Sequence, residues 1–239
     1  MLIFLDLETT GLEKDDKICS IGLIIIDNNK LEIKYDLTNE GKKIPPKASS
    51  IHNITNEMIK NKPKFKDTKS CKFLELNNNE DVTIVAHNVG FDLEKLLACG
   101  IRWRGKVIDT LRVTKHLIPE CEFFSLQFLR YELKLYKSEQ TQALACGINS
   151  NIVAHNALND ALILKLLFDE LLNYATQDEM YELSFKNVLM QKLNFGKYTD
   201  KYIEEIVMND RGYLEWLLRN VMDLDEDLRY SIVYYLEGC

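Results

Sequence analysis

The sequence opens with an apolar run that is followed at once by two acids at alternate positions. Residues 1–5 are all apolar, and Asp6 and Glu8 follow with one leucine between them. A continuous apolar run is typical of a strand covered on both faces of a sheet, and side chains two residues apart on a strand project from the same face. The two carboxylates would repel each other unless a cation lies between them. The segment predicts either a site for a hard divalent cation or the solvated end of a strand.

Strand and helix patterns follow one another along most of the chain. Three strands are expected first, at residues 1–5, 18–26 and 31–37, and the turn residues Asp27, Asn28 and Asn29 favour a hairpin between the last two. A buried strand at 82–86 precedes a helix at 91–99, and a short strand at 107–108 precedes a helix at 111–117. Further amphipathic helices are expected at 125–133 and 157–172. This order indicates an α/β domain with a mixed sheet that ends near residue 174.

The composition changes after that point. Residues 200–239 contain ten acids and four bases, together with a high density of aromatic side chains. Two or three short helices with a small core of their own are the expected structure there. The sequence is therefore predicted to divide into a domain at 1–174 and a helical C-terminal module at 175–239.

Charge and cysteine content narrow the class of protein. The chain of 239 residues has a formal charge of −7, so it is not expected to bind DNA through bulk charge. One stretch, at 60–72, holds six lysines and one acid, and is either a solvated loop or a surface for phosphate contacts. No apolar run reaches the roughly 20 residues that span a bilayer, and the first residues lack signal-peptide features. With six scattered cysteines, free thiols, a cytoplasmic location and no membrane partner are expected.

Two further acids lie at the starts of expected helices. Asp92 follows the strand at 82–86 within the sequence AHNVGFD, and Asp160 opens the helix at 157–172, five residues after His155. Taken alone, each acid is typical of a favourable charge near a helix N-terminus, and the histidine of a cap or surface position. Taken with Asp6 and Glu8, they provide four carboxylates and an imidazole at the ends of strands or the starts of helices.

The complete set of motifs resembles the DEDDh branch of the DnaQ-like 3′→5′ exonucleases, the superfamily of proofreading exonucleases and ribonuclease T. The supporting segments keep the expected order: DLETTGL at 6–12, IHNIT at 51–55, AHNVGFD at 86–92, VIDTL at 107–111 and HNALNDALI at 155–163. The resemblance covers about residues 1–174. One departure is the asparagine in IHNIT, where the family often has glycine; asparagine also tolerates a positive φ angle.

This resemblance implies a ribonuclease H-like fold in which a mixed five-stranded sheet is flanked by helices. It also implies that Asp6, Glu8, Asp92 and Asp160 hold two divalent cations, Mg²⁺ or Mn²⁺, which clamp the attacking and leaving oxygens of an in-line displacement. His155 is then the general base that deprotonates the attacking water, since an imidazole accepts protons near neutral pH. A histidine five residues before the last acid separates this branch from its tyrosine-using relative.

The same resemblance implies a metal-dependent 3′→5′ exonuclease that releases nucleoside 5′-monophosphates from a nucleic-acid 3′ end, with single-stranded DNA as the expected substrate. An RNA 3′-end exonuclease and a polymerase-associated proofreading subunit remain alternatives, with a polymerase or repair complex as a further partner. A catalytically inactive nucleic-acid-binding module is disfavoured because all four acids and the histidine are present. The terminal nucleotide is expected to contact Thr9, Thr10, Leu12, Asn88 and Phe91; the alternative is that these residues form only local turn and core structure.

Three short segments of the C-terminal part also resemble a known module. FGKY at 195–198, YLEWLL at 213–218 and DLRY at 227–230 look like the small C-terminal module of exodeoxyribonuclease X-type enzymes. Tyr213, Trp216 and Tyr230 are expected to form the core of this helical appendage; the alternative is that Lys197 and an aromatic face help to hold nucleic acid. Residues 200–239 account for −6 of the total charge of −7, so the rest of the chain is close to neutral and the charge argument against a nucleic-acid partner weakens.

Overall fold

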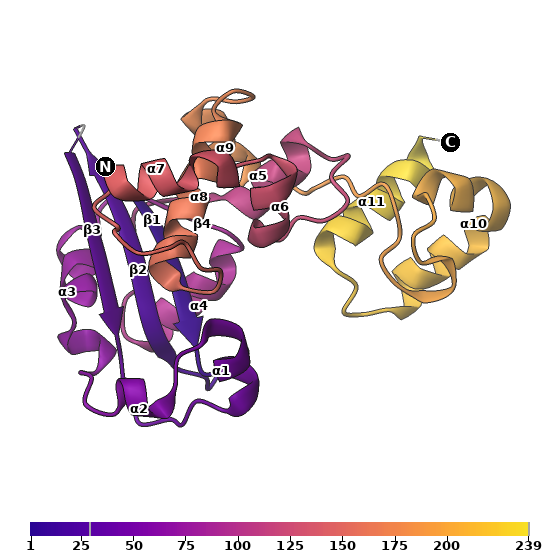
Figure 1. Ribbon diagram of the computed structural model, residues 1–239. Coiled ribbons are helices and arrows are strands. Elements are labelled where there is room, and N and C mark those ends of the chain that lie inside the picture. The colour runs from indigo at the N-terminus through magenta and orange to yellow at the C-terminus, as the bar shows by residue number, and fades with distance from the viewer. Residues whose placement is uncertain (29, 239) are drawn as a thin grey trace. The chain divides into compact units, whose positions relative to one another are not determined.

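The computed structural model describes residues 1–28 and 30–238, which form two compact units. The first unit spans Met1–Ser184 and the second begins at Phe185. Figure 1 shows that the first unit contains the sheet and that the second is helical. Each unit has a hydrophobic core of its own.

The first unit is built on a mixed five-stranded sheet with the strand order β3-β2-β1-β4-β5 (Figure 1). β2 pairs with β1 and β3 in antiparallel fashion, whereas β4 pairs with β1 and β5 in parallel. The predicted mixed sheet and its hairpin are thereby confirmed, although Asn29 of the predicted turn lies outside the described residues. The strands are Leu2–Thr9 (β1), Ile18–Asp27 (β2), Lys30–Leu37 (β3), Thr83–Ala86 (β4) and Lys106–Asp109 (β5).

Helices flank the sheet, and their starts follow the capping signals of the sequence. The side chains of Asp109, Ser125 and Asn156 cap α5, α6 and α8 by accepting backbone N–H groups of the first turn. The helices of this unit are Pro46–His52 (α1), Asn56–Ile59 (α2), Lys69–Leu76 (α3), Val89–Ala98 (α4), Thr110–Leu117 (α5), Leu126–Glu132 (α6), Tyr136–Ala145 (α7), Ala157–Leu171 (α8) and Gln177–Leu183 (α9), with a 3₁₀ turn at Phe65–Asp67 (η1).

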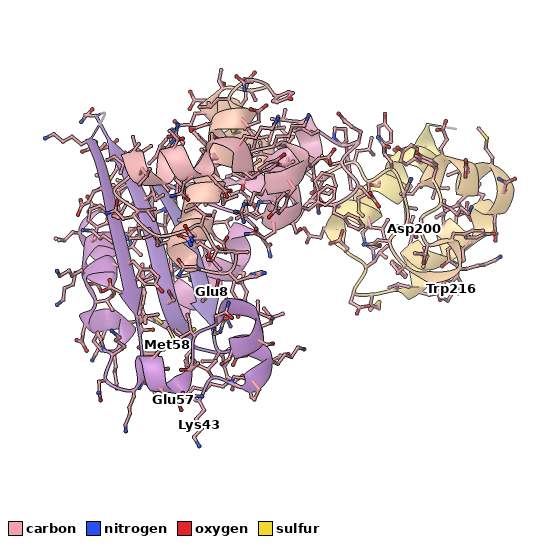
Figure 2. All side chains as sticks on the ribbon, in the orientation of Figure 1. Glu8, Lys43, Glu57, Met58, Asp200 and Trp216 are labelled. Atoms are coloured by element: carbon pink, nitrogen blue, oxygen red, sulfur yellow. The ribbon has the colours of Figure 1, made fainter. Side chains whose placement is uncertain are left out.

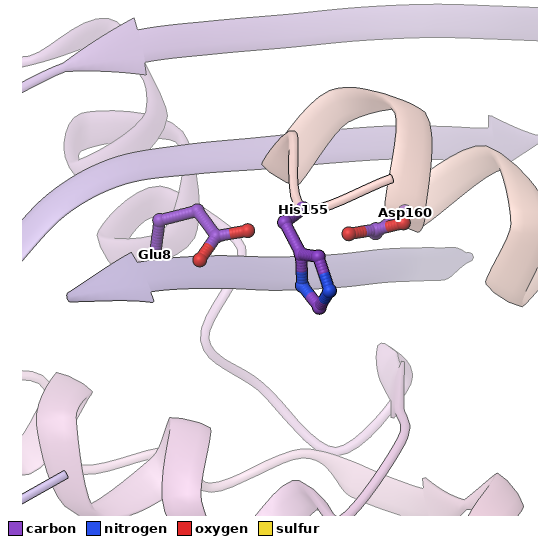
Figure 3. Close-up of side chains that lie close together, drawn as sticks. All are labelled: Glu8, His155 and Asp160. Carbon is purple, nitrogen blue, oxygen red and sulfur yellow. The ribbon is translucent and has the colours of Figure 1, made fainter. Parts of the chain in front are cut away.

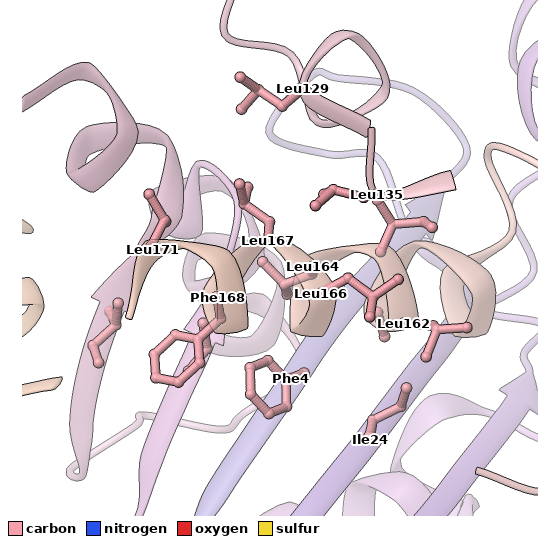
Figure 4. Close-up of a cluster of buried hydrophobic side chains, with 14 of the residues drawn as sticks. Phe4, Ile24, Leu129, Leu135, Leu162, Leu164, Leu166, Leu167, Phe168 and Leu171 are labelled. Carbon is pink, nitrogen blue, oxygen red and sulfur yellow. The ribbon is translucent and has the colours of Figure 1, made fainter. Parts of the chain in front are cut away.

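Alternate side chains of β1 enter two different cores. Phe4 packs in the cluster that α8 covers (Figure 4), and its ring meets that of Phe168 edge-on with centroids 5.3 Å apart. Leu5 belongs to the other large cluster of the unit. The period-two alternation of a strand then places Asp6 and Glu8 on the same face as Phe4. The packing of α8 against β1 therefore determines which helix meets the two carboxylates.

The start of α8 approaches the sheet closely at Gly22. This glycine lies opposite Asp6 in the register of β1 and β2, and a Cβ atom there would lie 2.2 Å from the carbonyl oxygen of Ala157. Only a residue without a side chain permits that approach. The short distance brings the first turn of α8, including Asp160, to the part of the sheet that carries Asp6.

Two of the predicted boundaries differ from the structure because of tertiary contacts. β1 continues to Thr9 rather than ending at residue 5, because β2 pairs with it through the acidic segment. Asp6 and Glu8 therefore lie within a paired strand and not at a solvated strand end. The first unit ends at Ser184 rather than near residue 174, because α9 packs on β5 and α5, and the Ser184 hydroxyl accepts the backbone N–H of Asp109 at 2.9 Å.

The second unit contains a 3₁₀ turn, η2 (Gly196–Tyr198), and the helices α10 (Ile203–Asn220) and α11 (Glu226–Glu237). α10 is kinked at Asp210, where φ is −153° and ψ is 59°, so the unit agrees with the two or three short helices predicted. Its core consists mainly of aliphatic side chains, among them Leu193, Ile203, Ile206, Leu214, Leu217, Leu228 and Ile232.

The prediction that the ring side chains form this core is wrong. Trp216 is 53% exposed and Tyr230 is 40% exposed, and Tyr213 only flanks the core. Leu214 and Leu217 are three residues apart and occupy the buried face of α10. Trp216 lies off that face and remains at the surface of the unit.

The described part of the chain contains no helix that is both long and apolar enough to cross a membrane. Five cysteines are free thiols, as predicted, and Cys239 lies outside the described residues. All six lysines at 60–72 are exposed, which agrees both with a solvated loop and with a surface for phosphate contacts.

Candidate active site

Four carboxylates and one imidazole come together beside the first turn of α8. Asp6 and Glu8 come from β1, Asp92 from the first turn of α4, and Asp160 from the first turn of α8. One carboxylate oxygen of Glu8, one ring nitrogen of His155 and one carboxylate oxygen of Asp160 lie within 4.8 Å of one another (Figure 3). Asp6 is near enough to the other three carboxylates for each of them to raise its pKa. The structure thus brings together all five residues that the sequence motifs singled out.

Asp92 is positioned by the turn between β4 and α4. The helix begins at Val89, earlier than the predicted residue 91, and Asn88 precedes it in the left-handed region with φ 67° and ψ 52°. The backbone N–H of Asn88 donates to the Asp109 carboxylate at 2.9 Å, and the same carboxylate accepts the N–H of Leu111 at 3.0 Å. One buried acid therefore fixes the starts of α4 and α5, and with them the place of Asp92.

The first turn of α8 positions the other two residues. Asn156 caps the helix by accepting the N–H of Asn159 at 3.2 Å, and the N–H of Asp160 donates to the Asn156 carbonyl at 2.8 Å. His155 precedes the cap with a positive φ of 58°. Asp160 is buried, whereas the imidazole of His155 is exposed beside it. The exposed imidazole is accessible to a substrate that approaches the carboxylates.

The electrostatic environment disfavours four negative charges at this position. Burial and the charge of Asp160 raise the pKa of Glu8 to about 8, and burial raises the pKa of Asp160 to about 7. Burial, together with neighbouring acids, also holds the pKa of Asp6 and that of Asp92 well above the ordinary range. A cation would favour the charged forms. Since Mg²⁺ and Mn²⁺ prefer carboxylate oxygens, the donor set fits a divalent metal.

Helix α6 contributes a residue that the sequence motifs did not identify. The side-chain amide of Gln127 donates to Oδ1 of Asp160 at 2.6 Å. The sequence shows only that Gln127 lies in an amphipathic segment, because its contact depends on how α6 packs against α8.

The loop after β1 is held together by its own hydroxyl groups. Thr9 donates to the carbonyl of Gly11 at 2.7 Å, and Thr10 donates to the Asp16 carboxylate at 2.7 Å. Both threonines are buried, whereas Leu12 is 83% exposed. Of the three residues predicted here to contact a nucleotide, Leu12 is the one that presents its side chain to solvent.

The other two predicted contact residues lie at the start of α4. Asn88 is exposed and Phe91 is partly buried. The ammonium group of Lys95 lies 5.2 Å from the centre of the Phe91 ring and also donates to the carbonyl of Glu13. Lys95 is only 2% exposed, so this side chain ties α4 to the loop that carries Leu12.

The asparagine of the IHNIT segment adopts the conformation that was expected for it. Asn53 has φ 60° and ψ 10° and ends α1, and its N–H donates to the Ser49 carbonyl. The neighbouring His52 is buried, and its Nδ1 accepts the N–H of Ile54 at 3.0 Å. Asparagine is therefore accommodated at this turn in the left-handed region, where glycine is also favoured.

A mixed sheet whose central strand carries two acids, with further acids from two helix starts, defines a ribonuclease H-like nuclease. The chain belongs to the Exonuclease family, whose sequence profile it matches over residues 3–168. A second profile, described as Exodeoxyribonuclease X-like C-terminal, matches residues 193–221, within the helical unit. Both resemblances seen in the sequence are thereby confirmed.

Named relatives agree with this assignment. The chain is 28% identical over 241 residues to "Exodeoxyribonuclease 10" of Escherichia coli K12, and all of both chains is covered. It is 31% identical over 172 residues to "DNA polymerase III subunit epsilon" of Treponema pallidum, which covers 68% of this chain and 72% of the relative. The solved structure "Exonuclease X in complex with 5' overhanging duplex DNA" is similar with a TM-score of 0.60 and 25% identity, over 77% of this chain and 99% of that one.

The crowding of the acids predicts how the metal-free protein responds to pH. The pKa values of Glu8 and Asp160 are raised to about 8 and about 7 in the folded state, whereas they lie near 4 in the unfolded chain. The two groups therefore stabilise the fold fully at a pH below about 4, and this stabilisation is lost as the pH rises toward 8. Asp6→Asn removes one repelling charge. In EDTA, its melting temperature should exceed that of the wild type at pH 8, by about 2–4 °C per kcal/mol of repulsion removed.

The difference should shrink toward pH 5, where the wild-type acids are largely protonated. Asp81→Asn, at an exposed position, serves as the matched control and should leave the melting temperature unchanged. An Asp6→Asn protein that is less stable than the wild type at every pH would show that the acids do not repel one another.

Proposed function

We propose that this protein is a metal-dependent 3′→5′ exonuclease that hydrolyses single-stranded DNA from its 3′ end and releases nucleoside 5′-monophosphates. The observation that carries the proposal is the convergence of Asp6, Glu8, Asp92 and Asp160 with the exposed imidazole of His155. The raised pKa values of these acids indicate that the site is built for positive charge. Membership of the Exonuclease family supports the same reaction class.

The four acids are the residues that would hold two divalent cations, Mg²⁺ or Mn²⁺. Bound there, the cations would neutralise the attacking and leaving oxygens of a phosphodiester in an in-line displacement. Glu8 and Asp6 are fixed by the pairing of β1 with β2. Asp92 is fixed by the bond of the Asn88 N–H to Asp109 at the start of α4, and Asp160 by the Asn156 cap of α8. Because the ligands come from three rigid elements, the site is preorganised for a substrate phosphate.

His155 is the residue proposed to accept the proton of the attacking water. Its imidazole has a ring nitrogen within 4.8 Å of carboxylate oxygens of both Glu8 and Asp160, and the side chain is exposed. It can therefore take up a proton beside the reacting phosphate and release it to solvent. No covalent intermediate is required, since water is the nucleophile.

DNA, rather than RNA, is the proposed substrate for two reasons. The relative that matches along its whole length is named as an exodeoxyribonuclease, and the similar exonuclease structure was solved with a DNA duplex that has a 5′ overhang. The exposed side chains of Leu12 and Asn88 and the half-buried ring of Phe91 are proposed to contact the terminal nucleotide. The proposed roles of Thr9 and Thr10 are limited to backbone contacts because their hydroxyl groups are bonded within the loop.

A polymerase-associated proofreading role is a second candidate, because a polymerase III epsilon subunit is 31% identical over 172 residues. The C-terminal profile favours the first candidate, since it is described as exodeoxyribonuclease X-like. RNA remains the alternative substrate. Cleavage rates on matched DNA and RNA oligonucleotides, measured with and without a polymerase, distinguish a DNA exonuclease, a proofreading subunit and an RNA exonuclease.

Activity on a labelled strand is the direct test. With Mg²⁺ or Mn²⁺, an oligodeoxynucleotide labelled at its 5′ end should shorten stepwise from its 3′ end, and EDTA should stop the reaction. Asp160→Asn should lower the rate by more than about 100-fold, because even residues behind a metal ligand contribute 10- to 100-fold. Intact substrate at saturating metal, with folded protein confirmed by circular dichroism, would exclude the proposed reaction.

The role of His155 has its own prediction. His155→Ala should lower kcat by about 10²- to 10⁴-fold, the usual contribution of a general base, while the rise in melting temperature caused by Mn²⁺ should persist because the four acids remain. His116→Ala, in the last turn of α5, is the matched control and should retain the wild-type kcat. A His155→Ala enzyme with wild-type kcat would show that another group accepts the proton.

A further inference from the structure

The helical unit carries a row of ring side chains and a lysine that the exonuclease site does not use. The row, called here the GKY face, consists of Lys197, Tyr198, Tyr213 and Trp216. The Lys197 ammonium lies 4.7 Å from the centre of the Tyr198 ring, which meets the Tyr213 ring at 5.2 Å and 75°. Tyr213 and Trp216 stack at 6.3 Å with only 21° between their planes. Trp216 is 53% exposed and is labelled in Figure 2.

The GKY face is held in place from behind by several independent contacts. The phenol oxygen of Tyr213 accepts the backbone N–H of Lys197 at 3.3 Å. Gly196 has a positive φ of 78°, and a Cβ atom there would lie 2.5 Å from the same oxygen. Asp210, at the kink of α10, accepts the Tyr198 hydroxyl at 2.8 Å and the N–H of Tyr213 at 3.3 Å. The rings are therefore preorganised, and Trp216 follows Tyr213 within one helical turn.

The segment that carries Lys197 is basic although the unit as a whole is acidic. Residues 186–201 contain four lysines and one acid. Asp210 and Glu215 lie beside the rings, and both are in ion pairs: Asp210 pairs with Lys197 at 3.1 Å, and Glu215 pairs with Arg211 at 3.2 Å and with Arg219 at 3.6 Å. These two acids beside the GKY face are therefore already matched by cations.

Lys197 can exchange its present partner for a phosphate. Its side chain is 63% exposed and pairs with Asp210 at 3.1 Å. An exposed ion pair of this kind contributes little to stability, so an anion on a bound strand can compete for the ammonium group. Asp210 keeps its hydrogen bonds to Tyr198 and Tyr213 after such an exchange.

We propose that the GKY face binds single-stranded nucleic acid, with a base stacked on the exposed ring of Trp216, which Tyr213 supports from behind, and a phosphate at Lys197. Exposed ring faces beside cations are the combination by which proteins hold single strands without reading their sequence. The benefit to catalysis rests on the function proposed above: a second contact in the same chain raises the effective concentration of the strand at the nuclease site. A strand held at both sites would dissociate less often between cleavage events.

Binding can be measured apart from cleavage. The full-length protein in EDTA is titrated into a fluorescent oligo(dT) strand, and binding is followed by anisotropy. Trp216→Ala should weaken binding by about 5- to 100-fold, the effect of losing one base-stacking ring. Tyr234→Ala removes a ring that is 52% exposed on α11 and is the matched control, with less than a twofold effect. Lys197→Gln should reduce the slope of the logarithm of the binding constant against the logarithm of the salt concentration by about 1, the effect of losing one phosphate contact.

A spectroscopic measurement guards against misfolded variants. The chain has two tryptophans, so Trp103→Phe leaves Trp216 as the reporter, and its emission should be quenched when oligo(dT) stacks on it. Unchanged emission at saturating DNA and RNA, or unaltered binding by Trp216→Ala, would overturn the proposal and leave a protein partner for this face. Strand binding without cleavage in Mg²⁺ or Mn²⁺ would instead overturn the exonuclease function and leave the GKY proposal standing.

A second, independent observation concerns the support of Asp160. Behind the Gln127 amide, the Gln127 side-chain oxygen accepts a hydrogen bond from Arg130 at 3.2 Å. Arg130 is 6% exposed and forms two hydrogen bonds with the Glu139 carboxylate, at 2.6 Å and 2.5 Å. The chain of contacts joins α8, α6 and α7. A bidentate, buried arginine pair has a fixed geometry, so it fixes the orientation of the glutamine.

We infer that Gln127 is a positioning residue that holds Oδ1 of Asp160 and so fixes the orientation of this carboxylate for binding a cation. Partners behind metal ligands usually change metal affinity 10- to 100-fold. The inference rests on the metal site of the proposed function. Gln127→Met keeps the length of the side chain and removes its hydrogen bonds, and Gln140→Met at an exposed position of α7 is the control.

Metal binding is read from the melting temperature as Mn²⁺ is added, which needs no turnover. The Mn²⁺ concentration at half-maximal stabilisation should rise about 10- to 100-fold in Gln127→Met and stay within twofold of the wild type in Gln140→Met. An unchanged midpoint in Gln127→Met would overturn the positioning role alone. A wild-type protein that Mn²⁺ does not stabilise would instead remove the metal site on which the proposed function depends.

Discussion

Repulsion between four carboxylates is the constraint around which the first unit is organised. The acids would separate if their elements could move, yet β1, α4 and α8 are each anchored by apolar packing or by a cap. Phe4 packs against Phe168, Gly22 allows α8 to approach the sheet, and Asp109 fixes the start of α4. The raised pKa of Glu8, about 8, shows that this arrangement is unfavourable for charge when no cation is present. The fold therefore holds these acids where bound protons or a bound cation have to offset their charge.

The distribution of charge along this chain says more about its partners than the total charge does. The formal charge of −7 argues against a nucleic-acid partner only if it is spread evenly. The acids of the nuclease site are gathered where cations fit, and residues 200–239 account for −6 of the total charge of −7. The lysines at 60–72 and 186–201 form two basic stretches. Local charge is therefore compatible with a polyanionic substrate in each unit.

The sequence was informative where local rules decide the structure. Alternation along a strand put Asp6 and Glu8 on one face, and the helical patterns located α5, α6 and α8 to within one residue at each end. It was uninformative where packing between elements decides. In the sequence, Gln127 is one residue of an amphipathic segment, and its bond to Asp160 forms only because α6 packs against α8. The exposure of Trp216 likewise depends on which face of α10 packs into the aliphatic core. The end of the first unit was misplaced because α9 joins the sheet through a tertiary contact at Ser184.

The two units use the same local device to place their functional side chains. In the nuclease unit, Asp109 accepts N–H groups at two helix starts and so fixes the turn that carries Asp92. In the helical unit, Asp210 accepts an N–H group where α10 restarts after its kink, and so fixes the turn that carries Tyr213. A capped helix start limits the freedom of the side chains in its first turn. Rigidity at the nuclease site keeps like charges together for a metal, whereas rigidity at the helical unit keeps flat rings exposed, where the hydrophobic effect alone would bury them.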